Sequence, residues 1–317
     1  MRRLIVLGGV LVLGVLSMTA AALQQPPKPS AAAIEVDKLA DNLYVLKALS
    51  AGAGGNTSVL VTANGVVVVD TKNPGWGQPL LDKIKTLTNK PVTMIINTHT
   101  HGDHVSGNVE FPASVDVVTH ENTKANMEAM RPPSFTAPPA GGPPPNIFTK
   151  NNGTGMAKRT FKDKMTIGSG ADQIDLFYFG PAHTNGDAMV LFPMARVLHM
   201  SDVFASKGLP GMDANNGGTG VGYANTLTKA ADFADKNNVE KIVNGHFNTM
   251  TTRADLREFI QYVGDFVKFA QDGKRSGKSV DEVAQAWKTP AKYVGYEAMP
   301  IPVRVRANVE LIFKETK

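Results

Sequence analysis

The sequence Thr98-His99-Thr100-His101-Gly102-Asp103-His104 follows directly on the apolar run Val92–Ile96. If residues 92–97 form a strand, side chains two apart share a face, so His99 and His101 can point two imidazoles at one place. Gly102 allows a sharp turn that brings a carboxylate and a third imidazole, from Asp103 and His104, beside them. Four ligand-type side chains within six residues exceed what one open metal position needs. The stretch therefore predicts two adjacent metal ions at a strand end.

Strand and helix patterns extend from this stretch in both directions. Two apolar runs joined by Asn64-Gly65 predict a hairpin before it, and a second series of strands followed by amphipathic helices is expected after it. The predicted strands are 42–49, 58–61, 66–70, 92–97, 115–119, 160–167, 173–179, 188–192, 197–200 and 239–243, and the predicted helices are 79–87, 122–130, 224–233, 255–270, 280–287 and 303–313.

Residues 1–22 have the pattern of a secretory signal peptide. A basic start, Met1-Arg2-Arg3, precedes the apolar stretch Leu4–Leu16 and the small residues Ala20-Ala21-Ala22. The apolar stretch is too short for a membrane span, which needs about 20 residues. We therefore expect an exported protein, periplasmic or secreted, that is not stably inserted in a membrane after cleavage.

Length, composition and charge limit the domain organisation and the kinds of ligand and partner that the chain can have. Residues 23–40 are predicted to form a flexible N-terminal segment, and 41–317 a single catalytic domain. The chain has no cysteine, which excludes disulfides and thiolate metal ligands. The formal charge of +5 falls to +3 without the two leader arginines, so the charge does not indicate a nucleic-acid partner. No pattern indicates an oligomeric state.

Two long segments lack a regular period. Residues 131–146 contain seven prolines, which excludes regular structure. A flap that covers substrate and a passive surface insertion are both consistent with this composition. Residues 208–222 contain six glycines and form a second candidate wall of a substrate site.

Further ligand-type residues follow later strand patterns. His183 comes after the strand ending near Phe179, Asp202 after Val197–Met200, and His246 after Val239–Val243. Loops at strand ends are where sheet-based enzymes gather functional groups. These three side chains are therefore candidates to complete the metal site.

The motifs His99-Thr100-His101-Gly102-Asp103-His104, Gly180-Pro181-Ala182-His183-Thr184, Ser201-Asp202 and Gly245-His246 together resemble the metallo-β-lactamase superfamily. The resemblance covers roughly residues 40–250. It implies an α/β fold of four layers, an αββα sandwich in which two mixed β-sheets are flanked by helices. It also implies a dinuclear zinc site along one edge.

The resemblance assigns a role to each ligand position. His99, His101 and His183 would hold the first metal, Asp103, His104 and His246 the second, and Asp202 would bridge the two. Cysteine or serine occupies the position of Asp202 in two groups of true lactamases, whereas an aspartate resembles the glyoxalase II and lactonase branches. His101 stands where di-iron oxidoreductases of the superfamily carry glutamate, which favours two zinc ions; iron and manganese accept the same ligand types.

The leading functional hypothesis is a dinuclear zinc metallo-hydrolase acting on a small-molecule substrate. A metal-bridging hydroxide would attack the carbonyl of an ester, thioester, lactone or lactam, and Asp103 would orient this hydroxide as a catalytic residue. The alternatives are a β-lactamase proper, an iron-dependent oxygenase and a non-catalytic metal-binding periplasmic protein. The sequence does not identify the residues that bind substrate.

Other polar residues have two interpretations each. His199 is either a core or supporting histidine or a further metal ligand. His120 either caps a helix or contacts the substrate. Asp187 either orients His183 or stabilises a turn. Asp70 either supports the metal loop or caps a strand. Lys207, Asn215 and Tyr223 are candidate substrate contacts or ordinary surface residues.

Overall fold

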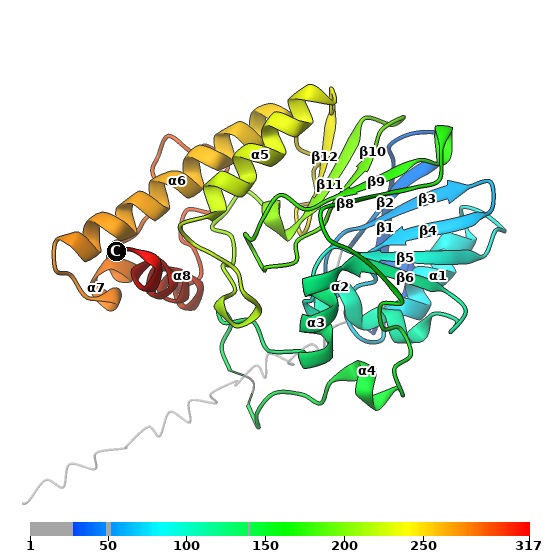
Figure 1. Ribbon diagram of the computed structural model, residues 1–317, viewed down its shortest axis with the longest axis horizontal. Helices are drawn as coiled ribbons and strands as arrows, with labels where there is room; N and C mark the ends of the chain where they lie inside the picture. Colours follow the sequence, from blue (N-terminus) through cyan, green and yellow to red (C-terminus); the bar gives the residue numbers. More distant parts are fainter. Residues whose placement is uncertain (1–27, 49–51, 139) are drawn as a thin grey trace, which may run out of the picture.

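The computed structural model describes residues 28–48, 52–138 and 140–317 (Figure 1). The predicted signal peptide, 1–22, lies outside the described residues. Within the described ranges, no helix combines the length and the apolar character that crossing a membrane requires.

The first half of the chain forms a seven-stranded mixed sheet, here called sheet A, whose strands lie in sequence order. The strands β1 to β4 pair antiparallel, and β4 to β7 pair parallel. The predicted hairpin joins β3 and β4, although the pairing of Thr62 with Gly65 puts the turn one residue earlier than predicted. The strands are β1 Ile34–Lys38, β2 Leu43–Ala48, β3 Thr57–Thr62, β4 Gly65–Val69, β5 Val92–Asn97, β6 Asp116–His120 and β7 Arg159–Phe161.

The second half forms a five-stranded sheet, sheet B, in the order β12-β11-β10-β9-β8. The pair β11 and β12 is parallel, and the other pairs are antiparallel, so this sheet is mixed as well. Its strands are β8 Lys164–Ile167, β9 Ile174–Phe177, β10 Met189–Phe192, β11 Val197–Ser201 and β12 Lys241–Asn244.

The valines of β4 show how the layers stack. Val66 and Val68 pack into a core with Leu80 and Ile84 of helix α1 (Gly77–Lys85), whereas Val67 and Val69 pack into a second core shared with sheet B. A strand that is buried on both faces is expected to be apolar at every position, as β4 is. Sheet A therefore lies between a helical layer and sheet B.

A third core covers the outer face of sheet B. There the side chains of β11 and β12 pack against α5 (Tyr223–Lys236), α6 (Arg253–Arg275) and α8 (Pro302–Glu315). Figure 1 shows α5 and α6 running together along this sheet, with α7 (Val280–Ala286) and α8 beside the far end of α6. The predicted four-layer αββα sandwich is thus confirmed. The remaining α-helices are α2 Gly102–Val105, α3 Glu121–Ala129 and α4 Ile147–Lys150.

Two sequence-based assignments were wrong. Ile34–Lys38, predicted to belong to the flexible segment 23–40, forms β1 at the edge of sheet A, where it pairs with β2. The single strand predicted over 160–167 is two strands, because the chain leaves sheet A after β7 and enters sheet B as β8.

The fold gathers the ends of several strands at one edge of the sandwich. The parallel strands β4 and β5 end there with Asp70 and with the stretch Thr98–His104. In sheet B, the parallel strands β11 and β12 lead into Asp202 and His246 at the same edge. Loops from both sheets therefore meet at this edge.

Candidate metal centre

All seven predicted ligand residues converge at this edge. His99, His101, His183 and Asp202 form one group in which the potential ligand atoms lie within 4.8 Å of one another. Asp103, His104 and His246 form a second group by the same measure. The two groups adjoin each other, because the ring centroid of His99, in the first group, lies 4.2 Å from that of His104, in the second.

Distances within the groups define which ring atoms face inward. In the first group, His101 Nδ1 lies 2.8 Å from His183 Nε2. In the second, His246 Nε2 lies 3.3 Å from His104 Nε2 and 3.2 Å from Asp103 Oδ2. These nitrogen and oxygen atoms are the donor types that zinc, iron and manganese accept in proteins.

Asp202 lies between the two groups. Its Oδ2 is 3.6 Å from His183 Nε2, and its Oδ1 is 3.3 Å from both His104 Nε2 and His246 Nε2. Each carboxylate oxygen thus faces a different group of histidines. Gly245 permits this placement, since a Cβ at position 245 would overlap Asp202 Oδ1.

Two buried polar atoms at the centre make no hydrogen bond with any described residue: His99 Nε2 and Asp202 Oδ1. Burying polar atoms without partners is costly, and a cation would satisfy both. The hydroxyl of Thr98 donates to Asp70 at 2.7 Å, so its oxygen is free to accept from His99 Nδ1 at 3.0 Å. That arrangement leaves a lone pair on His99 Nε2, as a metal ligand requires. The residues present therefore fit a metal ion.

Three further histidines are held by hydrogen bonds on the side away from the centre. His101 Nε2 contacts Asp213 Oδ2 at 2.8 Å, His183 Nδ1 contacts the Gly211 carbonyl at 2.7 Å, and His104 Nδ1 contacts Asp70 Oδ2 at 2.8 Å. An acceptor on one ring nitrogen keeps the proton there and leaves the other nitrogen as a ligand. The three outer acceptors thus fix both the orientation and the tautomer of these rings.

Asp70 supports the metal loop rather than only ending β4. Its carboxylate accepts hydrogen bonds from the backbone and hydroxyl of Thr98, besides its contact with His104. The φ angle of Asp70 is 63°, a left-handed conformation that aspartate tolerates better than most residues. Of the two roles predicted for Asp70, support of the metal loop therefore agrees with the geometry.

Burial and the neighbouring charged groups shift the pKa values of several side chains in the centre. Burial opposes protonation of His246, but Asp202 and Asp103 outweigh it and raise the pKa of His246 to about 9. Burial and the neighbouring His101 lower the pKa of His183 to about 4. Burial alone would raise the pKa of Asp213, but its hydrogen bond with His101 lowers it to about 2. The carboxylates thus attract positive charge into the centre.

A cavity of about 510 Å³ opens over the centre. The second group faces it most directly, since the side chains of His246 and Asp103 are 36% and 32% exposed. Pro133, Phe135 and Thr136 of the proline-rich segment line one side, and the Phe135 ring lies 5.7 Å from the His101 ring. The proline-rich segment is therefore part of the cavity wall. Its lining also includes Asn73, Gly102, Ala205, Ser206, Gly211 and Arg304.

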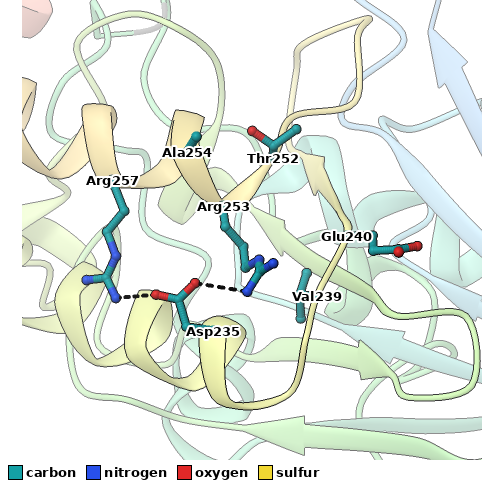
Figure 2. A pocket seen from close by; sticks show the side chains of 7 residues that line it. All are labelled: Asp235, Val239, Glu240, Thr252, Arg253, Ala254 and Arg257. Carbon is teal, nitrogen blue, oxygen red and sulfur yellow. Dashed lines mark hydrogen bonds and ion pairs between the residues drawn. The ribbon is translucent and has the colours of Figure 1, made fainter.

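A second concave surface, of about 580 Å³, lies away from these residues where α6 begins beside the end of α5 (Figure 2). Figure 2 shows Asp235 between Arg253 and Arg257, with ion-pair distances of 3.3 and 2.6 Å. These arginines already have acidic partners, so they offer no unpaired positive charge to a ligand.

The remaining singled-out residues have structural contacts. His120 caps α3 by accepting from the backbone of Asn122, and His199 is buried against Ser58 at 2.8 Å. Asp187 accepts from the backbone and hydroxyl of Thr184 and so stabilises the turn after His183.

None of the three predicted substrate contacts lines the cavity. Lys207 pairs with Asp255 at 2.7 Å, Asn215 donates to the Pro132 carbonyl, and Tyr223 is buried with its hydroxyl on the backbone after Ser201. The sequence patterns missed Asp213, Arg304 and Asn308, which reach the centre or its walls only through the tertiary fold.

Comparison with known proteins agrees with this architecture. The sequence profile of the metallo-beta-lactamase superfamily matches residues 51–246, and the chain belongs to that superfamily. Two curated relatives carry names that refer to different activities.

The first relative is metallo-beta-lactamase type 2 of Elizabethkingia meningoseptica, 28% identical over 75% of this chain and 86% of its own length. The second is the 2,4-dinitroanisole O-demethylase subunit alpha of Nocardioides sp. (strain JS1661), 27% identical over 44% of this chain and 38% of its own length. Among solved structures, the DIM-1 metallo-beta-lactamase superposes with a TM-score of 0.57 at 17% identity and covers 76% of this chain and 99% of its own.

Proposed function

We propose that this protein is a dinuclear zinc hydrolase that cleaves a carbonyl substrate such as an ester, thioester, lactone or lactam. His99, His101 and His183 would hold one ion, Asp103, His104 and His246 the other, and Asp202 would contact both. The observation that carries this proposal is the position of Asp202, whose two oxygens face different histidine groups.

When bound, zinc supplies two kinds of chemistry: it lowers the pKa of water toward about 7 and it polarises a carbonyl oxygen. The chain's own residues would organise this chemistry. Asp103 faces the cavity beside His246 and can accept a hydrogen bond from the attacking water, which aligns the water with the substrate. Phe135 covers one side of the first histidine group and limits the access of bulk water.

Two measurements test this proposal. Metal analysis by mass spectrometry on the purified protein should give close to two zinc ions per chain. A panel of esters, thioesters, lactones and β-lactams should contain at least one compound that the loaded protein hydrolyses. Iron in place of zinc, or tight zinc binding with no turnover across the panel, would contradict the proposal and favour an oxygenase or a non-catalytic metal-binding protein respectively.

Variants separate the metal centre from general folding effects. Replacing His101 and Asp103 together by alanine should abolish turnover and lower the metal content. The matched control is His120→Asn, because asparagine also caps helices and His120 contacts none of the seven residues. Full activity in the double variant would refute the assignment.

β-Lactams deserve their own arm of the panel because the curated relative with the longest match described above is a metallo-beta-lactamase. The aspartate at 202 leads us to propose a broader hydrolase rather than a β-lactamase proper. Rapid turnover of penicillins or carbapenems would reverse that preference.

We also propose that the chain is exported, on the basis of the leader pattern in residues 1–22. Sequencing the N-terminus of the mature protein, recovered from the periplasm or the medium, tests this directly. An intact Met1 on protein retained in the cytoplasm would contradict it.

A further inference from the structure

We propose that Arg304 binds a carboxylate of the substrate, so that the substrate class is a carbonyl compound that carries a second, anionic group. This inference rests on the proposed hydrolytic function and adds a recognition element to it. Arg304 lies outside residues 51–246, the part matched by the superfamily profile, so membership of the family does not assign it a role.

Arg304 lines the same cavity as the candidate metal ligands. It belongs to the first turn of α8, and its guanidinium lies over the Phe135 ring, 5.8 Å from the ring centroid. Phe135 also contacts the rings of His101 and His183, at 5.7 and 5.6 Å between centroids. The positive charge is therefore separated from the first histidine group by a single aromatic ring.

The guanidinium has unused hydrogen-bonding capacity. Its Nη1 donates to the Leu209 carbonyl at 3.1 Å, whereas its buried Nε has no hydrogen-bond partner among the described residues. No carboxylate in the described ranges lies within ion-pair distance of Arg304. The Nη2 of Arg304 has no hydrogen-bond acceptor among the described residues either, and a carboxylate that enters the cavity would supply one.

Among the other described arginines, Arg131 also forms no ion pair, but it does not line the cavity. Six of them form ion pairs with aspartate or glutamate: Arg159, Arg196, Arg253, Arg257, Arg275 and Arg306. All six lie outside the lining of the cavity. The unpaired guanidinium at Arg304 thus coincides with the wall of the candidate active site.

The position of Arg304 is held by the rest of α8. The buried side chain of Asn308 donates to the Pro210 carbonyl at 2.8 Å and accepts from the backbone of Met212 at 3.1 Å. Farther along the helix, Glu315 accepts from the backbone of Gly220 and Val221. These bonds fix α8 to the loop 208–222, so the guanidinium is preorganised and loses little freedom when an anion binds.

The charged residues that line the cavity would orient a substrate that carries a carboxylate. The cavity lining also contains Asp103 and Asp202, which would be neutralised by metal, while Arg304 supplies a permanent positive charge. A substrate with a carboxylate at one end would place that end at Arg304 and its carbonyl over the histidine groups. A single guanidinium suits one carboxylate, which it can bind with two parallel hydrogen bonds.

The first test uses two esters of one parent acid, one with a free pendant carboxylate and one with that group methylated. For Arg304→Met, we expect KM for the anionic ester to rise roughly 10- to 100-fold with little change in kcat, the range for losing a hydrogen bond to a charged group. KM for the neutral ester should not change, and Arg304→Lys should recover part of the loss. The control is Arg306→Met, since Arg306 lies two residues away and pairs with Asp281.

The second test does not need turnover. Calorimetry on the zinc-loaded protein compares glutarate with pentanoate, which differ by one carboxylate. We expect wild type and Arg306→Met to bind glutarate at least tenfold more tightly than pentanoate, and Arg304→Met to lose this preference. If no ester is hydrolysed but this preference is found, the hydrolytic function fails and the anion site stands. Equal losses for both esters, or an unchanged preference in Arg304→Met, would mean that Arg304 is only structural and would overturn the proposal.

Discussion

The hydrogen bond between His101 Nε2 and Asp213 Oδ2 makes Asp213→Asn an informative substitution. The other carboxylate oxygen, Oδ1, accepts from the backbone N–H groups of Ser134 and Asn215 at 2.9 and 3.0 Å. An asparagine keeps these two bonds only if its carbonyl oxygen takes the Oδ1 position. Its NH₂ group then replaces Oδ2, which contacts His101 Nε2 and accepts from the Asn216 side-chain amide, so the new donor would face two donors unless His101 changes its tautomer and the Asn216 amide turns over.

The expected consequence is a change of tautomer in His101. To accept from the amide, Nε2 must lose its proton, which moves to Nδ1, the nitrogen that faces His183 Nε2 at 2.8 Å. A protonated Nδ1 cannot bind metal. Losing a partner that orients a ligand histidine typically lowers metal affinity 10- to 100-fold, which corresponds to roughly 1.4–2.8 kcal/mol. The loss should fall on the first metal and spare the second.

Chelator competition with zinc, followed by the visible spectrum of the cobalt-substituted protein, would resolve the two binding steps. The matched control is Asp272→Asn, because Asp272 is on α6 and pairs only with Lys268 and Arg275 among the described residues. The substitution should not weaken the N-cap of the short 3-10 helix Ala214–Asn216, because asparagine caps helices as well as aspartate does. If Asp213→Asn binds both ions as tightly as wild type does, Asp213 does not set the tautomer of His101.

Three further outcomes are expected. Gly245→Ala should lower the zinc content measured by mass spectrometry, because a Cβ there would displace Asp202. The control is Gly264→Ala, in open space on α6, which should keep full metal content. Equal metal content in the two variants would contradict this prediction. Asn308→Leu should lower the free energy of unfolding in urea by about 2 kcal/mol or more, since it leaves two buried backbone groups without partners; a smaller loss would argue against the anchoring of α8. Burial lowers the pKa of Lys72 to about 7, so the folded state binds fewer protons than the unfolded state between that pH and about 10, and stability should rise with pH over this range. Unfolding curves of Lys72→Met should lack this rise, and parallel pH profiles for the two proteins would exclude the effect.

The metal loop could be predicted because its chemistry is local. Thr98–His104 places four ligand-type side chains within six residues after one strand, and strand periodicity predicts that His99 and His101 share a face. His183, Asp202 and His246 also follow strand patterns, so their positions at the edge could be expected. Their assignment to particular ions still rests on resemblance and remains a proposal.

The misplaced elements depend on pairing partners that local patterns do not reveal. Residues 160–167 alternate well enough to suggest one strand, but the corner at Lys162-Asp163 sends the chain from sheet A to sheet B. The five residues of β1 follow an alanine-rich stretch and are held by their pairing with β2. A short edge strand of this kind has little signal of its own.

The residues that tune the site were missed for a related reason. Asp213 is 112 positions from His101 in the sequence, within a glycine-rich loop that has no periodicity. Arg304 belongs to a helix that the sequence predicts, but its neighbours in the cavity come from the proline-rich segment and the metal loop. Only the tertiary fold brings such residues together.

The anchoring of α8 to the loop 208–222 has a consequence for how this protein can evolve. The helix lies beyond the part of the chain that the family profile matches, yet its Arg304 lines the cavity and the helix holds a loop that supports two candidate ligand histidines. Mutations in this tail can reshape the cavity without altering a single ligand residue. Selection could therefore change substrate preference in the last few dozen residues while the reactive centre stays constant, and directed evolution of a new specificity should begin there.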